Sequence, residues 1–329
     1  MKDKMKQKIL ISLAILLFCG IYSFSQTNNG NEPVQIVQDV HLYEYIPFGA
    51  NSKLASLNGN SSLKLNENLP RLDGATALYP VYASFVQAVY YNYYPSNYSS
   101  LSQGIVMCTQ TNRAYENLIN GNVDIIFCAE PSRDQIAQAA ERGLEFILTP
   151  IGIDAFVFFV NRMNPIDNIS SEQIRGIYSG EITNWQAVGG ENAVIIPYQR
   201  PKDSGSQTIL ENIIMRDTPI MEPLKENVVV GMGGIVERVS DYRNYINAIG
   251  YSFLFFTTEM VRNDEIKLLS IDGIMPSRET IQSNEYPFSG TFYAITTGNE
   301  TENTRRFIEW ILSEEGQYLV ERTGYIPIR

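Results

Sequence analysis

A strand, a polar turn and a helix follow one another in Val194-Ile-Ile-Pro-Tyr-Gln-Arg200-Pro-Lys-Asp-Ser204-Gly-Ser206 and the residues after it. Val194 to Tyr198 is a strand-like run, and the apolar residues of Ile209 to Ile214 recur on one helical face. Ser204 precedes that helix, where a hydroxyl can accept a hydrogen bond from a backbone N–H that has no partner inside the helix. A strand that leads through a turn into a helix is the unit of α/β folds.

The same alternation runs through the chain from Arg71 onward. Leu78 to Val89 and Tyr115 to Ile119 have helical spacing, whereas Ile105 to Cys108 and Val123 to Cys128 are strand-like. This series predicts βαβ units with a mostly parallel sheet flanked by helices.

A second series follows the apolar run from Asp154 to Val160. Ser170 and Gln173 have the spacing of a capping box for a helix that reaches Tyr178, and Tyr251 to Phe256 is again strand-like. A chain of 329 residues favours two lobes over a single core. The second series is therefore expected to build a second α/β lobe.

Two long strand-like segments, Ala155 to Val160 and Gly290 to Thr296, are natural crossings between the lobes. The C-terminal helices would then rejoin the first lobe. The expected organisation is a signal peptide at 1–25, an N-terminal extension at 26–68, lobe one at 69–156 and 288–329, and lobe two at 157–287.

The N-terminus has the features of an export signal. Four lysines lie between Lys2 and Lys8, the apolar run Ile9 to Phe18 is too short to span a bilayer, and Ser23-Phe24-Ser25 is a small-x-small cleavage site. Cys19 allows a lipid anchor, but the bulky Phe18 before it makes a soluble periplasmic or envelope protein the favoured reading.

The composition limits the partners. The chain is 44% hydrophobic and 19% charged, carries a net charge of −11, and has no basic run, which argues against nucleic acid and anionic membranes as partners. Cys108 and Cys128 each end an apolar run and are expected to be buried free thiols rather than a disulfide or a metal site. No cofactor is indicated, and we expect a monomer.

Three turns rich in Ser and Thr open helices in a similar way: Asp73 to Pro80, Thr109 to Asn112, and Arg200 to Ser206. A helix N-terminus offers unpaired N–H donors and a partial positive charge, and hydroxyl groups add donors. Gly205 would let the backbone approach a ligand closely, and Arg200 would supply a bidentate cation. Each turn alone is typical of an ordinary helix cap, but three that converge could hold a desolvated oxyanion.

The motif Arg200-x-x-x-Ser204-Gly205-Ser206 resembles the Arg-x-x-x-Ser-Gly-Thr element of the periplasmic phosphate-binding proteins of ABC importers, and Gly74-Ala75-Thr76 resembles their first anion loop. Further similarity extends from about Leu69 to Arg329 and includes Ile177 to Trp185. The resemblance implies a type II periplasmic-binding-protein fold. It also implies a hinged closure around phosphate and delivery to the membrane subunits of an importer.

The resemblance also implies a set of ligand contacts. These are Thr76 and Ala77 in the first turn, Thr111 or else Thr109 in the second, and Arg200, Ser204, Gly205 and Ser206 in the third. Glu130 stands where the family has an aspartate that accepts the proton of hydrogen phosphate, a contact that fully ionised sulfate cannot satisfy. If Glu130 instead faces solvent or pairs with Arg200, the ligand could be sulfate or molybdate.

Other classes of function have less support. The single histidine is His41, the usual hydrolase and metal-site motifs are missing, and a Ser204 nucleophile would have no obvious base, so no enzyme is expected. A scaffold or sensor that kept the fold without transport is one alternative, and a binder of sulfate, molybdate or tungstate is another. Extracytoplasmic phosphate capture for an ABC importer is the favoured reading.

Overall fold

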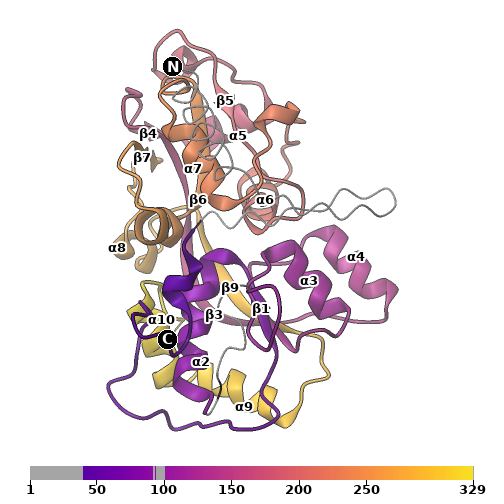
Figure 1. The fold of residues 1–329 in the computed structure, drawn as a ribbon. Coiled ribbons are helices and arrows are strands. Elements are labelled where there is room, and N and C mark those ends of the chain that lie inside the picture. Colours follow the sequence, from indigo (N-terminus) through magenta and orange to yellow (C-terminus); the bar gives the residue numbers. More distant parts are fainter. Residues whose placement is uncertain (1–39, 92, 94–100, 329) are drawn as a thin grey trace, which may run out of the picture. The chain divides into compact units, whose positions relative to one another are not determined.

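The computed structural model describes residues 40–91, 93 and 101–328 (Figure 1). The predicted signal peptide, Cys19 and the first part of the predicted extension lie outside these residues. The described residues belong to one compact unit, Val37–Arg329. Within them, no helix combines the length and the apolar character that a membrane crossing requires.

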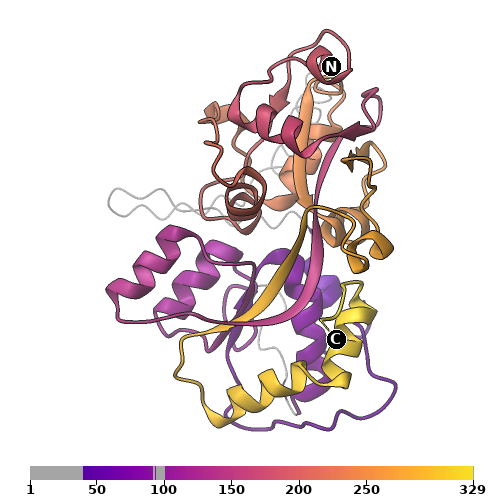
Figure 2. The same ribbon diagram turned by 180° about the vertical axis from the view of Figure 1, so that it is seen from behind.

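The sheet is organised around β3 (Ile147–Asn161), which is 15 residues long. Up to Ala155 it pairs with β9 (Ser289–Thr296), and from Phe156 onward it pairs with β6 (Ala248–Phe253) and β7 (Ile266–Leu268). Figure 2 shows β3 and β9 side by side. The two predicted crossing segments are thus part of two neighbouring strands.

The seven-stranded sheet has the order β1-β2-β9-β3-β6-β5, with β7 beside β3. Its other strands are β1 (Leu72–Gly74), β2 (Ile125–Cys128) and β5 (Ile196–Pro197), and a separate pair is formed by β4 (Asn168–Ile169) and β8 (Ser270–Ile271). We call the half built on β1, β2, β9 and the start of β3 the first lobe, and the half built on β4 to β8 and the end of β3 the second lobe.

The expectation of a mostly parallel sheet was wrong, because the sheet is mixed. Only the pairs β1–β2, β5–β6 and β4–β8 are parallel, whereas β9 is antiparallel to both of its neighbours and β3 is antiparallel to β6, β7 and β9. The reason is topological. The chain enters the second lobe along β3 and returns along β9, so the two crossing strands run in opposite directions.

Helices cover the sheet in both lobes. The first lobe has α2 (Tyr79–Val89), α3 (Thr111–Ile119), α4 (Arg133–Glu141), α9 (Glu302–Ile311) and α10 (Glu314–Thr323), and α10 packs against α2. The second lobe has α5 (Ser171–Ser179), α6 (Gly205–Ile209), α7 (Met232–Ser240) and α8 (Arg278–Gln282). A π-helical segment, Leu210–Met215, continues α6, and a second one lies at Phe256–Val261. Short 3-10 turns lie at Leu42–Tyr45, Thr76–Leu78, Trp185–Val188 and Lys225–Asn227.

Local sequence signals had mixed outcomes. The capping box before α5 is confirmed, since Ser170 Oγ accepts from the Gln173 N–H at 3.1 Å and Gln173 Oε1 accepts from the Ser170 N–H at 2.9 Å. The strand expected at residues 105–108 was wrong: this described segment forms only a single parallel bridge between Val106 and Leu72. The neighbouring strand, β1, is only three residues long, so it offers residues 105–108 few backbone groups to pair with.

Each lobe has its own hydrophobic core. The core of the second lobe gathers around the buried rings of Phe158, Trp185 and Tyr251. The core of the first lobe gathers around α2, Phe127 and the C-terminal helices. A smaller cluster around Tyr115 and Ile126 adds to the first lobe. Separate cores in the two lobes are what the two-lobed α/β prediction required.

Cys108 and Cys128 are buried free thiols in the described part of the chain, as predicted. Burial raises the pKa of the Cys108 thiol to about 12, so this group stays protonated at neutral pH and packs as a small apolar side chain.

Candidate functional site

A small cavity of about 30 Å³ lies where the starts of three helices meet. Its walls include Ala77 from the turn before α2, Thr111 from the first position of α3, and Gly205 from the first position of α6. The first two residues belong to the first lobe and Gly205 belongs to the second. The cavity therefore brings together the three turns that the sequence singled out.

The first turn is held at the carboxyl end of β1. Ala75 donates its backbone N–H to the Phe127 carbonyl at 2.9 Å, which ties the turn to β2. A Cβ atom on Gly74 would lie 2.6 Å from that same carbonyl oxygen, so only glycine fits this approach. Pro80 lies in the first turn of α2, where a missing N–H costs nothing. The turn thus presents its backbone where parallel strands end, the usual place for a ligand in an α/β sheet.

The second turn separates two neighbouring threonines. Thr109 donates its hydroxyl to Asp73 Oδ2 at 2.6 Å and its backbone N–H to Asp73 Oδ1 at 2.8 Å, and Asn117 also donates to Oδ2. Burial raises the pKa of Asp73, and these hydrogen bonds oppose the shift. The hydroxyl of Thr109 therefore holds the buried Asp73 in place, while Thr111 lines the cavity.

In the third turn, Ser204 caps α6, with its hydroxyl accepting from the Gln207 N–H at 3.4 Å. Gly205 faces Thr111 across the two lobes, and a Cβ atom at position 205 would lie 2.8 Å from Thr111 Oγ1. The lobes can approach this closely only because residue 205 has no side chain. Ser206, the next residue in the chain, is also buried.

Arg200 lies at the start of the third turn with its side chain largely buried. Its backbone N–H donates to Gln207 Oε1 at 3.0 Å and to Tyr251 Oη at 2.9 Å. These contacts fix the main chain of Arg200 after β5. Thr76, Arg200, Ser204 and Ser206 are not themselves walls of the small cavity, although each is next or close in sequence to a residue that is.

Glu130 is likewise not a wall of the small cavity, although its neighbour in sequence, Ala129, is. Its Oε1 accepts from the Tyr293 hydroxyl at 3.0 Å, and its side chain lines a separate, open groove of about 1160 Å³. Burial and the neighbouring Glu130 charge raise the pKa of Tyr293 to about 12, so the tyrosine remains a donor to the carboxylate. One oxygen of the carboxylate that the family resemblance assigned to the ligand's proton thus accepts a hydrogen bond from Tyr293 on β9.

Sequence reasoning missed Asp154, which lines the small cavity. It lies on β3 opposite Gly290, two residues before Phe156, where the strand begins to pair with β6 instead of β9. Its side chain is buried, and burial raises its pKa to about 7, against the opposing effect of the backbone N–H groups of Ala155 and Phe255. A charged residue at the head of an apolar strand was the one signal that could have drawn attention to it.

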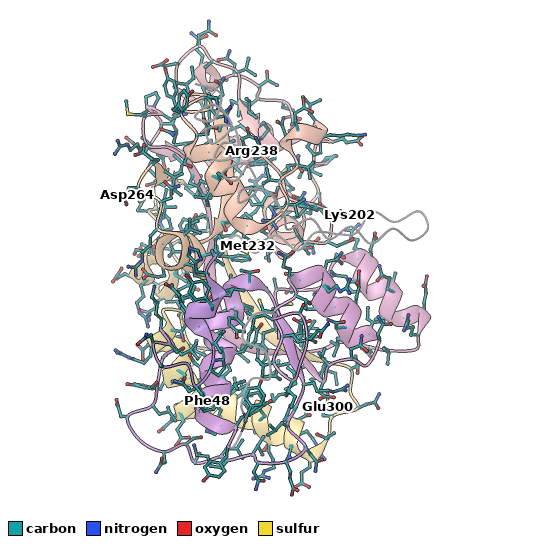
Figure 3. All side chains as sticks on the ribbon, viewed as in Figure 1. Phe48, Lys202, Met232, Arg238, Asp264 and Glu300 are labelled. Atoms are coloured by element: carbon teal, nitrogen blue, oxygen red, sulfur yellow. The ribbon has the colours of Figure 1, made fainter. Side chains whose placement is uncertain are left out.

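Contacts between the lobes border this site. Lys202, in the turn before α6, forms an ion pair with Asp134 in the first turn of α4. Next to it, Gln135 Nε2 donates to the Asp203 carbonyl at 3.2 Å. Figure 3 labels Lys202 in this region of the second lobe. The turn that carries Ser204 and Gly205 is thus attached to the first lobe by two polar contacts.

Comparison with known proteins agrees with this architecture. Residues 68–315 match the PBP superfamily domain. A phosphate-binding protein PstS from Borreliella burgdorferi is 30% identical over 218 residues, which cover 64% of this chain and 76% of the relative. The chain belongs to the PstS family of the PBP superfamily. Another PstS protein, from Staphylococcus aureus strain COL, is 23% identical over 281 residues, and the match covers 80% of that relative's length.

Solved structures show the same fold as this PstS-family chain. A Clostridium perfringens protein, described as a phosphate ABC transporter substrate-binding protein and crystallised with phosphate, superposes with a TM-score of 0.59 at 23% identity. The aligned region covers 79% of this chain and 99% of the Clostridium perfringens protein. A phosphate transport receptor from Vibrio cholerae gives a TM-score of 0.57 at 19% identity, with 78% and 99% covered. The two-lobed type II periplasmic-binding fold is therefore confirmed, as is the family resemblance noticed in the sequence.

Proposed function

We propose that this PstS-family protein captures phosphate between its two lobes outside the cytoplasm and delivers it to the membrane subunits of an ABC importer. The observation that carries the proposal is the meeting of Ala77, Thr111 and Gly205 from two lobes at one cavity. Each of these residues lies at the start of a helical segment, where backbone N–H groups point outward.

The proposed donors suit a tetrahedral anion. Backbone N–H groups and hydroxyls from Thr76, Ala77, Thr111, Ser204, Gly205 and Ser206 would bind its oxygens. The guanidinium group of Arg200 would be the principal counter-charge, with bidentate geometry. Glu130 is left out of this set because its carboxylate accepts from Tyr293 in the groove.

The proposed mechanism is closure of the lobes around the anion. The first lobe, proposed as 69–156 with 288–329, supplies two of the turns, and the second lobe, proposed as 157–287, supplies the third. The ligand gains its full set of donors only when the lobes meet, so binding stabilises the closed state. The change of partner along β3 after Ala155 supports this boundary.

Several features agree with a carrier rather than a catalyst. The relatives are named for binding phosphate, and the N-terminal sequence favours export. We propose a monomer in the periplasm or cell envelope, with no catalytic activity of its own. An anchor through Cys19 is the less favoured arrangement.

Thermal melts of phosphate-free protein with phosphate, sulfate, molybdate or tungstate test the proposal. A ligand that binds only the folded state adds about 2.7 kcal/mol of stability at a hundred times its Kd. We expect phosphate to raise Tm most. A larger shift with molybdate or tungstate would assign a different oxyanion, and no shift with any anion would favour a scaffold or sensor.

A further inference from the structure

The small cavity is bordered mainly by apolar residues, although it lies where the three proposed anion-binding turns meet. These residues come from both lobes and include Ala77, Leu78, Ala129, Ile209, Phe253 and Phe292. A charged oxygen inside such a wall would find few hydrogen-bond partners to replace the water that it leaves.

The polar residues of the wall change this little. Of the side chains proposed to bind the anion, only that of Thr111 belongs to a wall residue. The one charged residue among the described walls is Asp154, whose Oδ1 accepts from the Ala155 N–H at 2.8 Å and whose Oδ2 exposes almost no surface. The cavity is therefore an apolar space beside the proposed donors.

The size of the cavity limits what could enter it. Its volume is about 30 Å³. A single water-sized group needs roughly 10–15 Å³, whereas a cavity that binds benzene has a volume on the order of 150 Å³. A methyl group therefore fits this cavity, and a phenyl ring does not.

We propose that the site accepts small alkylphosphonates as well as phosphate, with the alkyl group in the small cavity. This inference rests on the proposed function. A phosphonate carries three oxygens and one carbon on its phosphorus atom. The three turns would bind the oxygens, and the methyl group of methylphosphonate would contact the walls that include Phe253 and Phe292. Binding leaves the carbon–phosphorus bond intact.

The fourth substituent of the phosphorus atom decides between phosphate and an alkylphosphonate. A phosphate oxygen that enters an apolar cavity gives up hydrogen bonds to water without replacing them. A methyl group has none to give up, and its removal from water is favourable. A site that hydrogen-bonds all four oxygens of phosphate would instead reject methylphosphonate by about 10⁴-fold or more, because buried donors would be left unpaired.

Calorimetric titration of the phosphate-free wild type with phosphate, methylphosphonate and phenylphosphonate at pH 8.5 separates these two arrangements. We expect methylphosphonate to bind less than about a hundredfold more weakly than phosphate, and phenylphosphonate to bind at least about a hundredfold more weakly than methylphosphonate. A protein that binds neither phosphate nor either phosphonate would refute the proposed function.

Two other outcomes would refute only the alkylphosphonate inference. The first is phosphate binding with methylphosphonate weaker by about a hundredfold or more. The second is phenylphosphonate binding as tightly as methylphosphonate, because the substituent would then lie in open solvent and not in the cavity.

Phe253→Leu tests where the alkyl group lies. Replacing this wall residue by a smaller one should enlarge the cavity, so ethylphosphonate should gain at least about fivefold in affinity relative to methylphosphonate. Phe288→Leu is the matched control, because Phe288 is a buried ring of the second-lobe core that is not a wall of the cavity. It should leave this ratio unchanged.

Circular dichroism should show that both variants fold. Equal ethyl-to-methyl ratios in the two variants would contradict the placement of the alkyl group in the cavity. If either variant does not fold, the series of ligands on the wild type still decides the inference.

Discussion

The ammonium group of Lys202 forms an ion pair with the carboxylate of Asp134, and this pair joins the turn before α6 to the first turn of α4. The two residues come from different lobes. The pair is neighboured by the hydrogen bond from Gln135 to the Asp203 carbonyl. Contacts of this kind exist only while the lobes are together, so they contribute to the closed state and not to either lobe alone.

Lys202→Ala should weaken anion binding slightly without lowering the stability of the ligand-free protein. Both side chains are largely exposed, so the pair is screened, and we expect a loss of less than about fivefold, larger at low salt. Calorimetry at two salt concentrations measures this. Lys267→Ala, which removes the ion pair with Asp167 within the second lobe, is the control and should leave affinity unchanged. Equal effects from the two variants would show that the Lys202 pair has no special part in closure.

Arg200→Ala should abolish anion binding and leave the fold intact. The guanidinium is the proposed counter-charge, and loss of charge-assisted hydrogen bonds should cost about a hundredfold or more in affinity. The main chain is held independently, because the Arg200 N–H donates to Gln207 and Tyr251. Circular dichroism should show an unchanged fold, and titration with phosphate should show little binding. Arg200→Lys should recover part of the affinity, since it restores charge but not bidentate geometry. Full affinity in Arg200→Ala would remove this residue from the site.

Thr109→Ala and Thr111→Ala should separate stability from binding. Without Thr109, the buried Asp73 loses the hydroxyl that donates to it at 2.6 Å, and we expect a loss of about 1–3 kcal/mol in the free energy of unfolding. Thr111→Ala should cost little stability but weaken phosphate binding about tenfold or more. Urea unfolding and calorimetry measure the two quantities. The reverse pattern would assign the second-turn contact to Thr109.

Asp154→Asn should stabilise the ligand-free protein at pH 8 more than at pH 4. The folded pKa of Asp154, about 7, lies above its value near 4 in the unfolded chain, so the native state binds this proton more tightly. The free energy of unfolding of the wild type should therefore fall by up to about 4 kcal/mol as pH rises from about 4 to 7. Asp154→Asn has no carboxylate at this position, so its free energy of unfolding should not fall for this reason. Urea unfolding at both pH values checks it, and a wild-type to variant difference that does not grow with pH would contradict the raised pKa.

Local patterns carried much of what could be predicted. The Ser170 capping box and the Arg200 to Ser206 turn depend on residues that are close together in sequence. Rules for the local backbone are therefore enough to predict them. The mixed sheet could not be read in this way. It depends on β9 returning between β2 and β3, a pairing that no local pattern specifies.

The details of the site depended on long-range contacts. The sequence favours Thr111 as the hydroxyl donor but leaves Thr109 possible, and only the contact of Thr109 with the buried Asp73 separates the two. The orientation of Glu130 is set by Tyr293, 163 residues further along the chain. Asp154 was noticed only as the polar edge of an apolar run, because its place beside Gly205 exists only in the folded chain.

The strand order also constrains how the chain is made. β9 is the last strand to be synthesised, yet it lies between β2 and β3 in the sheet. The early segments of the first lobe cannot complete their sheet until the C-terminal part of the chain has emerged. The second lobe, in contrast, consists of one continuous stretch of the chain. We expect the second lobe to fold first as the exported chain emerges from the membrane, and a chain truncated before β9 to keep the first lobe's apolar strands open to chaperones and proteases.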